Sequence, residues 1–229
     1  MTAEEWRQDV VNRMTGECMI PEHILQTPDK DRRAPSNGNQ GGVANLQSHA
    51  LLYSDIIRSF LSDGTRILDV GSGCGLGTRA YFICTGVPVI AIDRADSHRL
   101  GEMLYPCPGV IRVVADVQDE LHDDVLFHAP YDVVTMTNVY EHISAADAEQ
   151  ACANIDQVTT DDGVVVITVP TWPEGDDPNP FHLRTFRSKD EALDEIQSRL
   201  SGNKRVVWAR TGEGALPWGQ AARDDALKQ

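Results

Sequence analysis

The chain has 229 residues, of which 41% are hydrophobic, and its formal net charge is -15 at pH 7. This length and composition favour one globular domain with a full core, and no apolar run is long enough to cross a bilayer. The polar first residues argue against a signal peptide, and five cysteines without a CxxC pair indicate reduced thiols, so we expect a cytoplasmic protein. The acidic charge disfavours long contacts with nucleic acid, although it leaves room for a short local site.

The chain begins with a polar segment that is rich in loop-forming residues. Residues 4–14 are compatible with a short helix, whereas residues 36–42 read SNGNQGG, which is typical of a loop. We expect residues 1–45 to form either an N-terminal cap over the site or a flexible segment. Residues 46–229 form the predicted main domain.

From residue 46 onward, helical patterns alternate with apolar runs of strand length. Strands are predicted over 66–70, 87–92, 110–115, 131–137, 163–169 and 204–209, and helices over 46–61, 77–85, 97–105, 145–159 and 188–200. Such alternation implies right-handed crossovers between parallel strands. We therefore predict an α/β fold, a Rossmann-like, doubly wound and mostly parallel sheet with helices on both faces.

A glycine-rich loop follows the first predicted strand. Residues 67–77 read ILDVGSGCGLG, with glycine at four alternate positions. Glycine permits tight turns and a close approach of the backbone to a ligand. A dinucleotide-binding loop has the spacing Gly-x-Gly-x-x-Gly, whereas here the third glycine comes one residue earlier. From the loop alone, cofactor binding and close packing of a strand on a helix are both open.

Two later strands are each followed by an acidic residue. Asp93 follows the run 87–92, where a carboxylate can accept hydrogen bonds from both hydroxyls of a ribose. Asp116 follows the run 110–115 in the same way. The expected site for an adenosine-containing ligand therefore combines the glycine loop with these two carboxylates. For Asp93, capping of the next helix is the alternative.

Together these motifs resemble those of class I S-adenosylmethionine-dependent methyltransferases, of the type 11 and type 23 kind, over roughly residues 46–200. The resemblance implies S-adenosylmethionine as the cofactor. It also implies that Asp69 helps to orient the amino-acid part, and that Asp116 bonds the adenine amino group with Val117 against the ring. The family usually has a final antiparallel strand, for which residues 215–222 are the candidate. The cofactor-binding residues implied in this way are Asp69, Gly71, Ser72, Gly73, Gly75, Asp93, Arg94, Asp116, Val117 and Asn138.

The pair Glu141 and His142 follows the fourth predicted strand. It resembles the Glu-His pair of a methyltransferase group that includes ubiquinone-biosynthesis O-methyltransferases and small-RNA 3′-end methyltransferases, where a Glu-x-x-Glu-His arrangement binds a divalent metal. Asn138 stands in place of the first glutamate and is a weaker ligand for a hard cation, so we predict no metal. We predict that His142 is a general base with Glu141 beside it, since imidazole titrates near neutral pH. Metal binding and a role in packing at a helix start are the alternatives.

A His-x-Arg pattern at His182 and Arg184 follows the fifth predicted strand and a proline-rich loop. It resembles a pattern of small-molecule and sugar-tailoring methyltransferases. His182 is predicted as a second catalytic base, and Arg184 as a bidentate ligand for a substrate carboxylate or phosphate. Tyr140 and Trp172 complete the predicted substrate-binding residues. The alternative for Arg184 is an ion pair with acidic residues of the chain, and the alternative for Trp172 is packing.

These features predict methyl transfer from S-adenosylmethionine to an oxygen or nitrogen of a small-molecule or sugar-containing acceptor. Neither nucleic acid nor a membrane is expected as a partner. One alternative is a metal-dependent methyltransferase that acts on a nucleic-acid end. The other is a catalytically inactive subunit that keeps the fold for binding. The sequence gives no indication of the oligomeric state.

Overall fold

The computed structural model of the chain describes residues 60, 64–73, 75–94, 97–98, 102, 107–172 and 182–208. The expected N-terminal segment 1–45, nearly all of the helix expected over 46–61, and the final strand expected over 215–222 lie outside these residues. Among the described residues, no helix combines the length and apolar character needed to span a lipid bilayer.

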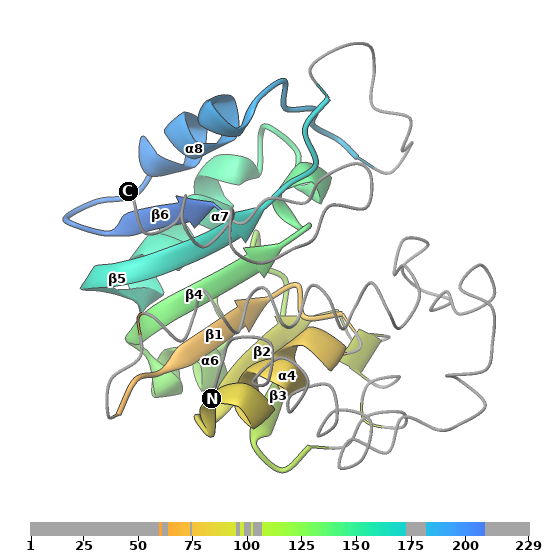
Figure 1. Cartoon of the computed structure of the whole chain (residues 1–229), viewed down its shortest axis with the longest axis vertical. Helices are drawn as coiled ribbons and strands as arrows, with labels where there is room; N and C mark the ends of the chain where they lie inside the picture. Colours follow the sequence, from red (N-terminus) through yellow and green to blue (C-terminus); the bar gives the residue numbers. More distant parts are fainter. Residues whose placement is uncertain are drawn as a thin grey trace, which may run out of the picture.

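In the described part of the chain, six parallel strands form one sheet in the order β3-β2-β1-β4-β5-β6 (Figure 1). The strands are β1 (Ile67–Val70), β2 (Val89–Asp93), β3 (Val110–Val114), β4 (Tyr131–Thr137), β5 (Thr159–Thr168) and β6 (Arg205–Trp208). The chain builds outward from β1 to β3 and then crosses back to continue from β4 to β6. The predicted parallel, doubly wound sheet is therefore confirmed.

Helices cover both faces of the sheet because successive strand residues point to opposite sides. The described helices are α4 (Leu76–Thr85), α6 (Asp123–His128), the 3-10 turn η2 (Tyr140–His142), α7 (Ala148–Val158) and α8 (Lys189–Gln197). Ile67 packs in a cluster with Tyr81 of α4 on one face. Its neighbour Leu68 packs with Ile155 of α7 and Ile196 of α8 on the other.

Most predicted elements differ from the structure by one to three residues at their ends, and two differ by more. Residues 123–128 are predicted to lie in a loop because they have no apolar stripe, but they form helix α6. Only Val125 of this helix is buried, which explains the missing stripe. Strand β5 begins at Thr159, four residues before the predicted start at residue 163. The prediction missed its first residues because Asp161 and Asp162 are exposed and are typical of a turn. Of the helix expected over 97–105, Ser97, His98 and Glu102 are described and helical.

Candidate active site

Two loops meet where the strand order reverses, beyond the carboxyl ends of β1 and β4. In open parallel sheets, ligands bind at such a point. Residues 71–73 and 75 belong to the loop after β1, and residues 138–142 form the loop after β4. A Cβ atom on Gly71 would clash with the side chain of Val139. Glycine at this position therefore allows the two loops to pack against each other.

Glycines give the loop after β1 its shape. Gly71, Gly73 and Gly75 have φ angles of 66°, 59° and 80°, a region that residues with a side chain rarely adopt. The backbone amides of Gly71 and Ser72 donate to the carbonyl of Ile92 at 2.9 and 3.1 Å, which holds the loop against the end of β2. The loop thus presents backbone with few side chains, and Gly75 caps the start of α4.

Asp69, two residues before the loop, is buried between α4 and β4. Its side chain is buried, and its two carboxylate oxygens accept hydrogen bonds from the hydroxyls of Thr78 in α4 and Thr135 in β4, the latter at 2.6 Å. Burial raises the pKa of Asp69 to about 6, against the lowering effect of the two threonines. In this arrangement Asp69 ties β1, α4 and β4 together. Its predicted contact with the cofactor would have to be indirect.

Asp93 connects the end of β2 to the glycine loop. Its carboxylate accepts hydrogen bonds from the backbone amides of Gly73 and Arg94, each at 2.6 Å. Arg94 itself is exposed. The half-buried Asp93 carboxylate is thus held at the strand end, where the sequence predicts a ribose contact.

His98 also contacts the glycine loop, a contact that the sequence did not predict. Its Nε2 lies 3.2 Å from the hydroxyl oxygen of Ser72, and its side chain is 3% exposed. Burial lowers the pKa of this imidazole, while Asp93 raises it. The only sequence signal for the contact is the position of His98 in the first turn of the helix after Asp93.

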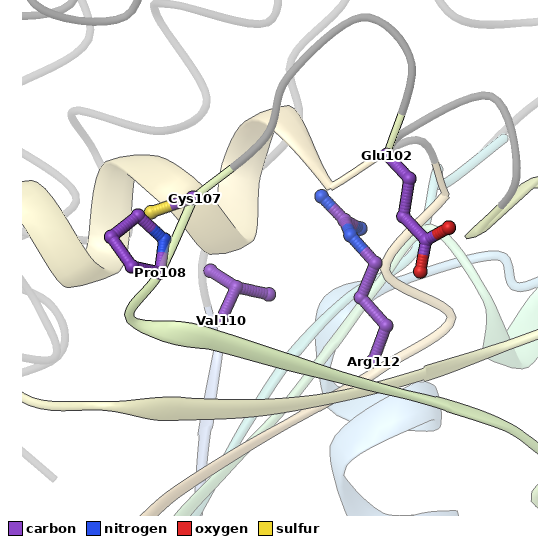
Figure 2. Close-up of a pocket in the computed structure, with 5 residues that line it drawn as sticks. All are labelled: Glu102, Cys107, Pro108, Val110 and Arg112. Atoms are coloured by element: carbon purple, nitrogen blue, oxygen red, sulfur yellow. The ribbon is translucent and has the colours of Figure 1, made fainter.

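The Arg112 side chain also contacts the glycine loop, at Gly75. This side chain extends from β3 toward the start of α4 and lies next to Glu102, and both line a groove of about 480 Å³ (Figure 2). Cys107 and Pro108 line the same groove beyond Val110. A Cβ atom on Gly75 would clash with the Arg112 guanidinium. The early third glycine therefore makes room for an arginine as well as for a turn.

Asp116 and Val117 follow β3, in the position predicted for adenine contacts. Asp116 is half-buried, and its carboxylate accepts hydrogen bonds from the backbone amide and the side-chain amide of Gln118, each at 3.3 Å. Val117 is buried, and its carbonyl accepts a 2.7 Å hydrogen bond from the side chain of Asn154 in α7. These bonds fix the turn after β3 against α7.

Asn138 joins the ends of β4 and β5. It has a φ of 53°, which a residue other than glycine adopts rarely and asparagine tolerates best. Its backbone amide donates to the carbonyl of Thr168 at 2.9 Å, and its side-chain oxygen accepts from the Thr168 hydroxyl at 3.2 Å. The side chain is therefore occupied with β5 rather than with the pair Glu141 and His142.

The structure brings together the three residues predicted to be catalytic. Ligand atoms of Glu141, His142 and His182 all lie within 4.8 Å of one another. The two imidazole rings meet edge to face, with ring centroids 4.8 Å apart. Glu141 is buried, His182 is half-buried and His142 is exposed. The backbone carbonyl of Glu141 accepts hydrogen bonds from the amides of Leu183 and Arg184 at 2.8 and 3.1 Å, which sets the two segments side by side.

Tyr140 and Arg184 contact each other and α8. Tyr140 is fully buried, and its hydroxyl donates to Glu195 at 2.9 Å. Arg184 forms an ion pair with the same carboxylate. These contacts give both side chains a structural role, but Nη1 of Arg184 is buried with no hydrogen-bond partner among the described residues, so the predicted binding of a substrate anion by Arg184 stays a prediction. Trp172 is half-buried, and its indole N–H is buried with no hydrogen-bond partner among the described residues.

Comparison with known proteins identifies the fold. A family model described as "Methyltransferase domain" matches residues 44–206. No curated protein matches the chain in sequence. Solved structures with a similar fold include TnmH, with 16% identity over 86% of this chain and 62% of that one and a TM-score of 0.54. The pyocyanin biosynthetic protein PhzM has 19% identity over 82% and 57% and a TM-score of 0.53.

A third similar structure is the YcgJ protein from Bacillus subtilis, with 19% identity over 66% of this chain and 67% of that one and a TM-score of 0.51. The chain spans between about half and two thirds of the length of these structures. At such identities the likeness concerns the fold. The family model covers most of the chain, including the glycine loop, Asp93, Asp116 and the pair Glu141 and His142. The chain therefore belongs to the methyltransferase domain family and has the class I fold, whose cofactor is S-adenosylmethionine.

Proposed function

We propose that this protein transfers the methyl group of S-adenosylmethionine to an oxygen or nitrogen atom of a small-molecule or sugar-containing acceptor. The pair of imidazole rings at His142 and His182 carries this proposal. His142 belongs to the loop that packs on the glycine loop through Val139 and Gly71, and the segment of His182 is bonded to that loop through the carbonyl of Glu141. A group that can remove a proton is therefore close to the expected cofactor.

The residues around the glycine loop suit the cofactor. The loop offers backbone rather than bulky side chains, and the half-buried Asp93 at the end of β2 is available to ribose hydroxyls. His98 contacts Ser72 of the loop, and its Nδ1 and the hydroxyl of the adjacent Ser97 are buried with no hydrogen-bond partner among the described residues. A polar ligand bound at this point would satisfy buried polar atoms of this kind.

The proposed reaction requires that the acceptor atom is aligned with the methyl group and that this acceptor atom loses a proton. S-adenosylmethionine supplies an activated methyl group on a positively charged sulfur. Alignment of the acceptor atom with that methyl group can lower the barrier by roughly 7–11 kcal/mol in favourable cases. A histidine base can add a factor on the order of 10²–10⁴. We assign this role to His142 and His182, with the buried Glu141 beside them.

The proposal is tested by a screen for release of S-adenosylhomocysteine with alcohols, phenols, amines and sugars as acceptors. Turnover with at least one acceptor should fall by about 10²–10⁴-fold in His142→Ala or His182→Ala. His128→Ala is the control, because His128 ends α6 just before β4 begins and is remote from the carboxyl ends of the strands. Full activity in both site variants would contradict the assigned base. Cofactor binding without turnover on any acceptor would favour the inactive binding subunit.

A second candidate function uses a divalent metal at Glu141, His142 and His182 to act on a nucleic-acid end. The juxtaposition of one carboxylate and two imidazoles favours it, since two histidines and a carboxylate form a common metal-ligand set. The occupied side chain of Asn138 and the acidic net charge weigh against it. Calorimetry with Zn²⁺, Mn²⁺ and Mg²⁺ distinguishes the two functions. This candidate fails if no metal binds and a chelator leaves turnover unchanged.

A further inference from the structure

We propose that Glu195 of α8 is a positioning residue that holds His142 and His182 in contact. This inference rests on the function proposed above, because it concerns how the two imidazoles are kept together. Glu195 lies outside every motif that the sequence indicates. The carboxylate of Glu195 binds Tyr140 and Arg184, so the proposed role acts through these two residues.

One carboxylate binds side chains from both histidine-bearing segments. One oxygen of Glu195 accepts a 2.9 Å hydrogen bond from the hydroxyl of Tyr140, which stands two residues before His142. The other accepts from the guanidinium of Arg184, which stands two residues after His182. The link therefore joins residues flanking the two imidazoles through a single side chain on a third element.

Aromatic contacts reinforce this link. The guanidinium carbon of Arg184 lies 4.5 Å from the ring centroid of Tyr140 and 5.0 Å from that of Phe186. The two rings stack at an interplanar angle of 22°. Arg184 is thus placed over two rings and paired with a carboxylate, a geometry that a lysine could not reproduce.

The ion pair between Arg184 and Glu195 is largely shielded from water, which strengthens it. The side chains of Arg184 and Glu195 are 11% and 25% exposed. Burial alone would raise the pKa of Glu195, but hydrogen bonds from Arg184 and Tyr140 bring it below its ordinary value. Arg199, one turn later in the chain, adds a second cation 3.3 Å from the carboxylate. A charge-assisted bond in such a setting holds its partners more firmly than an exposed ion pair does.

The backbone carries this constraint to the imidazoles. The amides of Leu183 and Arg184 donate to the carbonyl of Glu141. In the chain, Glu141 stands between Tyr140 and His142, and Leu183 stands between His182 and Arg184. If the Arg184 side chain loses Glu195, it loses the charged partner that it shares with Tyr140 of η2, and the stacking of the guanidinium on Tyr140 and these two backbone hydrogen bonds are left without that support. We therefore expect the contact between the rings, with centroids 4.8 Å apart, to depend on Glu195.

The test variant is Glu195→Gln in the full chain, and Asp194→Asn is its matched control. Asp194 is the exposed neighbour on the same helix, so the control makes the same change of charge outside the network. With ¹³C-labelled histidine rings, the wild type and the control should show a cross-peak between His142 and His182. We expect Glu195→Gln to lose it. The amides of Leu183 and Arg184 should exchange about tenfold or more faster, as for loss of a hydrogen bond to a charged group.

Three results would overturn the proposal. They are retention of the cross-peak in Glu195→Gln, its equal loss in Asp194→Asn, and its loss together with amide protection throughout the sheet. Should Glu195→Gln fail to fold, Tyr140→Phe removes only the hydroxyl from the network and must weaken the same cross-peak. These readouts need no acceptor. Absence of methyl transfer would therefore refute the proposed function without touching the role of Glu195, and the reverse also holds.

Discussion

The carboxylate of Asp93 accepts a hydrogen bond from the backbone amide of Gly73 at 2.6 Å, which joins the end of β2 to the glycine loop after β1. Asp93→Ala removes this bond and the group that is expected to bind the ribose. We expect the affinity for S-adenosylmethionine to fall by about 10- to 100-fold, since a hydrogen bond to a charged group contributes about 1.5–3 kcal/mol. Titration calorimetry measures the change.

Asp132→Ala is the control for this experiment. The Asp132 carboxylate also accepts a hydrogen bond from a backbone amide, that of Arg66 at 2.8 Å, but at the amino ends of β1 and β4. The cofactor affinity of this variant should match that of the wild type. Similar losses in both variants would mean that Asp93 acts through general stability.

The sequence predicts the strands well because most are short apolar runs that end at a glycine or a polar residue. Strand β4 has the predicted bounds, and the others differ mainly at their ends. Helix α6 was not predicted because it buries one side chain, that of Val125, and its sequence therefore has no apolar residues at helical spacing. The spacing of apolar residues indicates which side chains are buried, so a helix that buries few side chains is hard to predict from the sequence.

The candidate site shows a similar limit. Glycines and strand-end carboxylates are local signals, so the cofactor side of the site was predicted from single positions. Tyr140 was expected to face a substrate, yet it is fully buried against Glu195, which comes 55 residues later. Likewise, Ser72 pairs with His98, which belongs to another element. Which side chains meet across elements depends on packing that no local pattern encodes.

Gly71→Ala should destabilise the fold by more than Gly86→Ala. Both glycines have positive φ angles, of 66° and 70°, so both substitutions carry a backbone cost of about 1–2 kcal/mol. Only at Gly71 does the new methyl group meet a side chain, that of Val139. Overpacking should add about 1–3 kcal/mol there. Urea denaturation measures both, and Val139→Ala should restore part of the stability of Gly71→Ala. Equal losses at the two positions would disprove close packing of the loops.

Asp69 should make the protein less stable as pH rises through the acidic range. Its pKa of about 6 exceeds the ordinary value of 3.8, so the folded state binds more protons than the unfolded state between these values. The free energy of unfolding then decreases with rising pH in this window, by about 3 kcal/mol for this group alone. Asp69→Asn should lack this decrease. Urea denaturation from about pH 4 to pH 7 measures it, and identical slopes for variant and wild type would refute the prediction.

His98 should have the opposite effect at slightly higher pH. Burial lowers its pKa below 6.5, opposed by Asp93 and Glu102 and reinforced by Arg112. The unfolded chain therefore binds more protons below about pH 6.5, and the free energy of unfolding falls as pH decreases through this value. His98→Gln keeps an amide that can bond Ser72 but does not titrate, so stability should depend less on pH between about 5 and 7. His128→Gln, at the end of α6, should keep the wild-type profile. If His98→Gln also keeps it, the imidazole of His98 does not change its protonation in this range between the folded and unfolded chain.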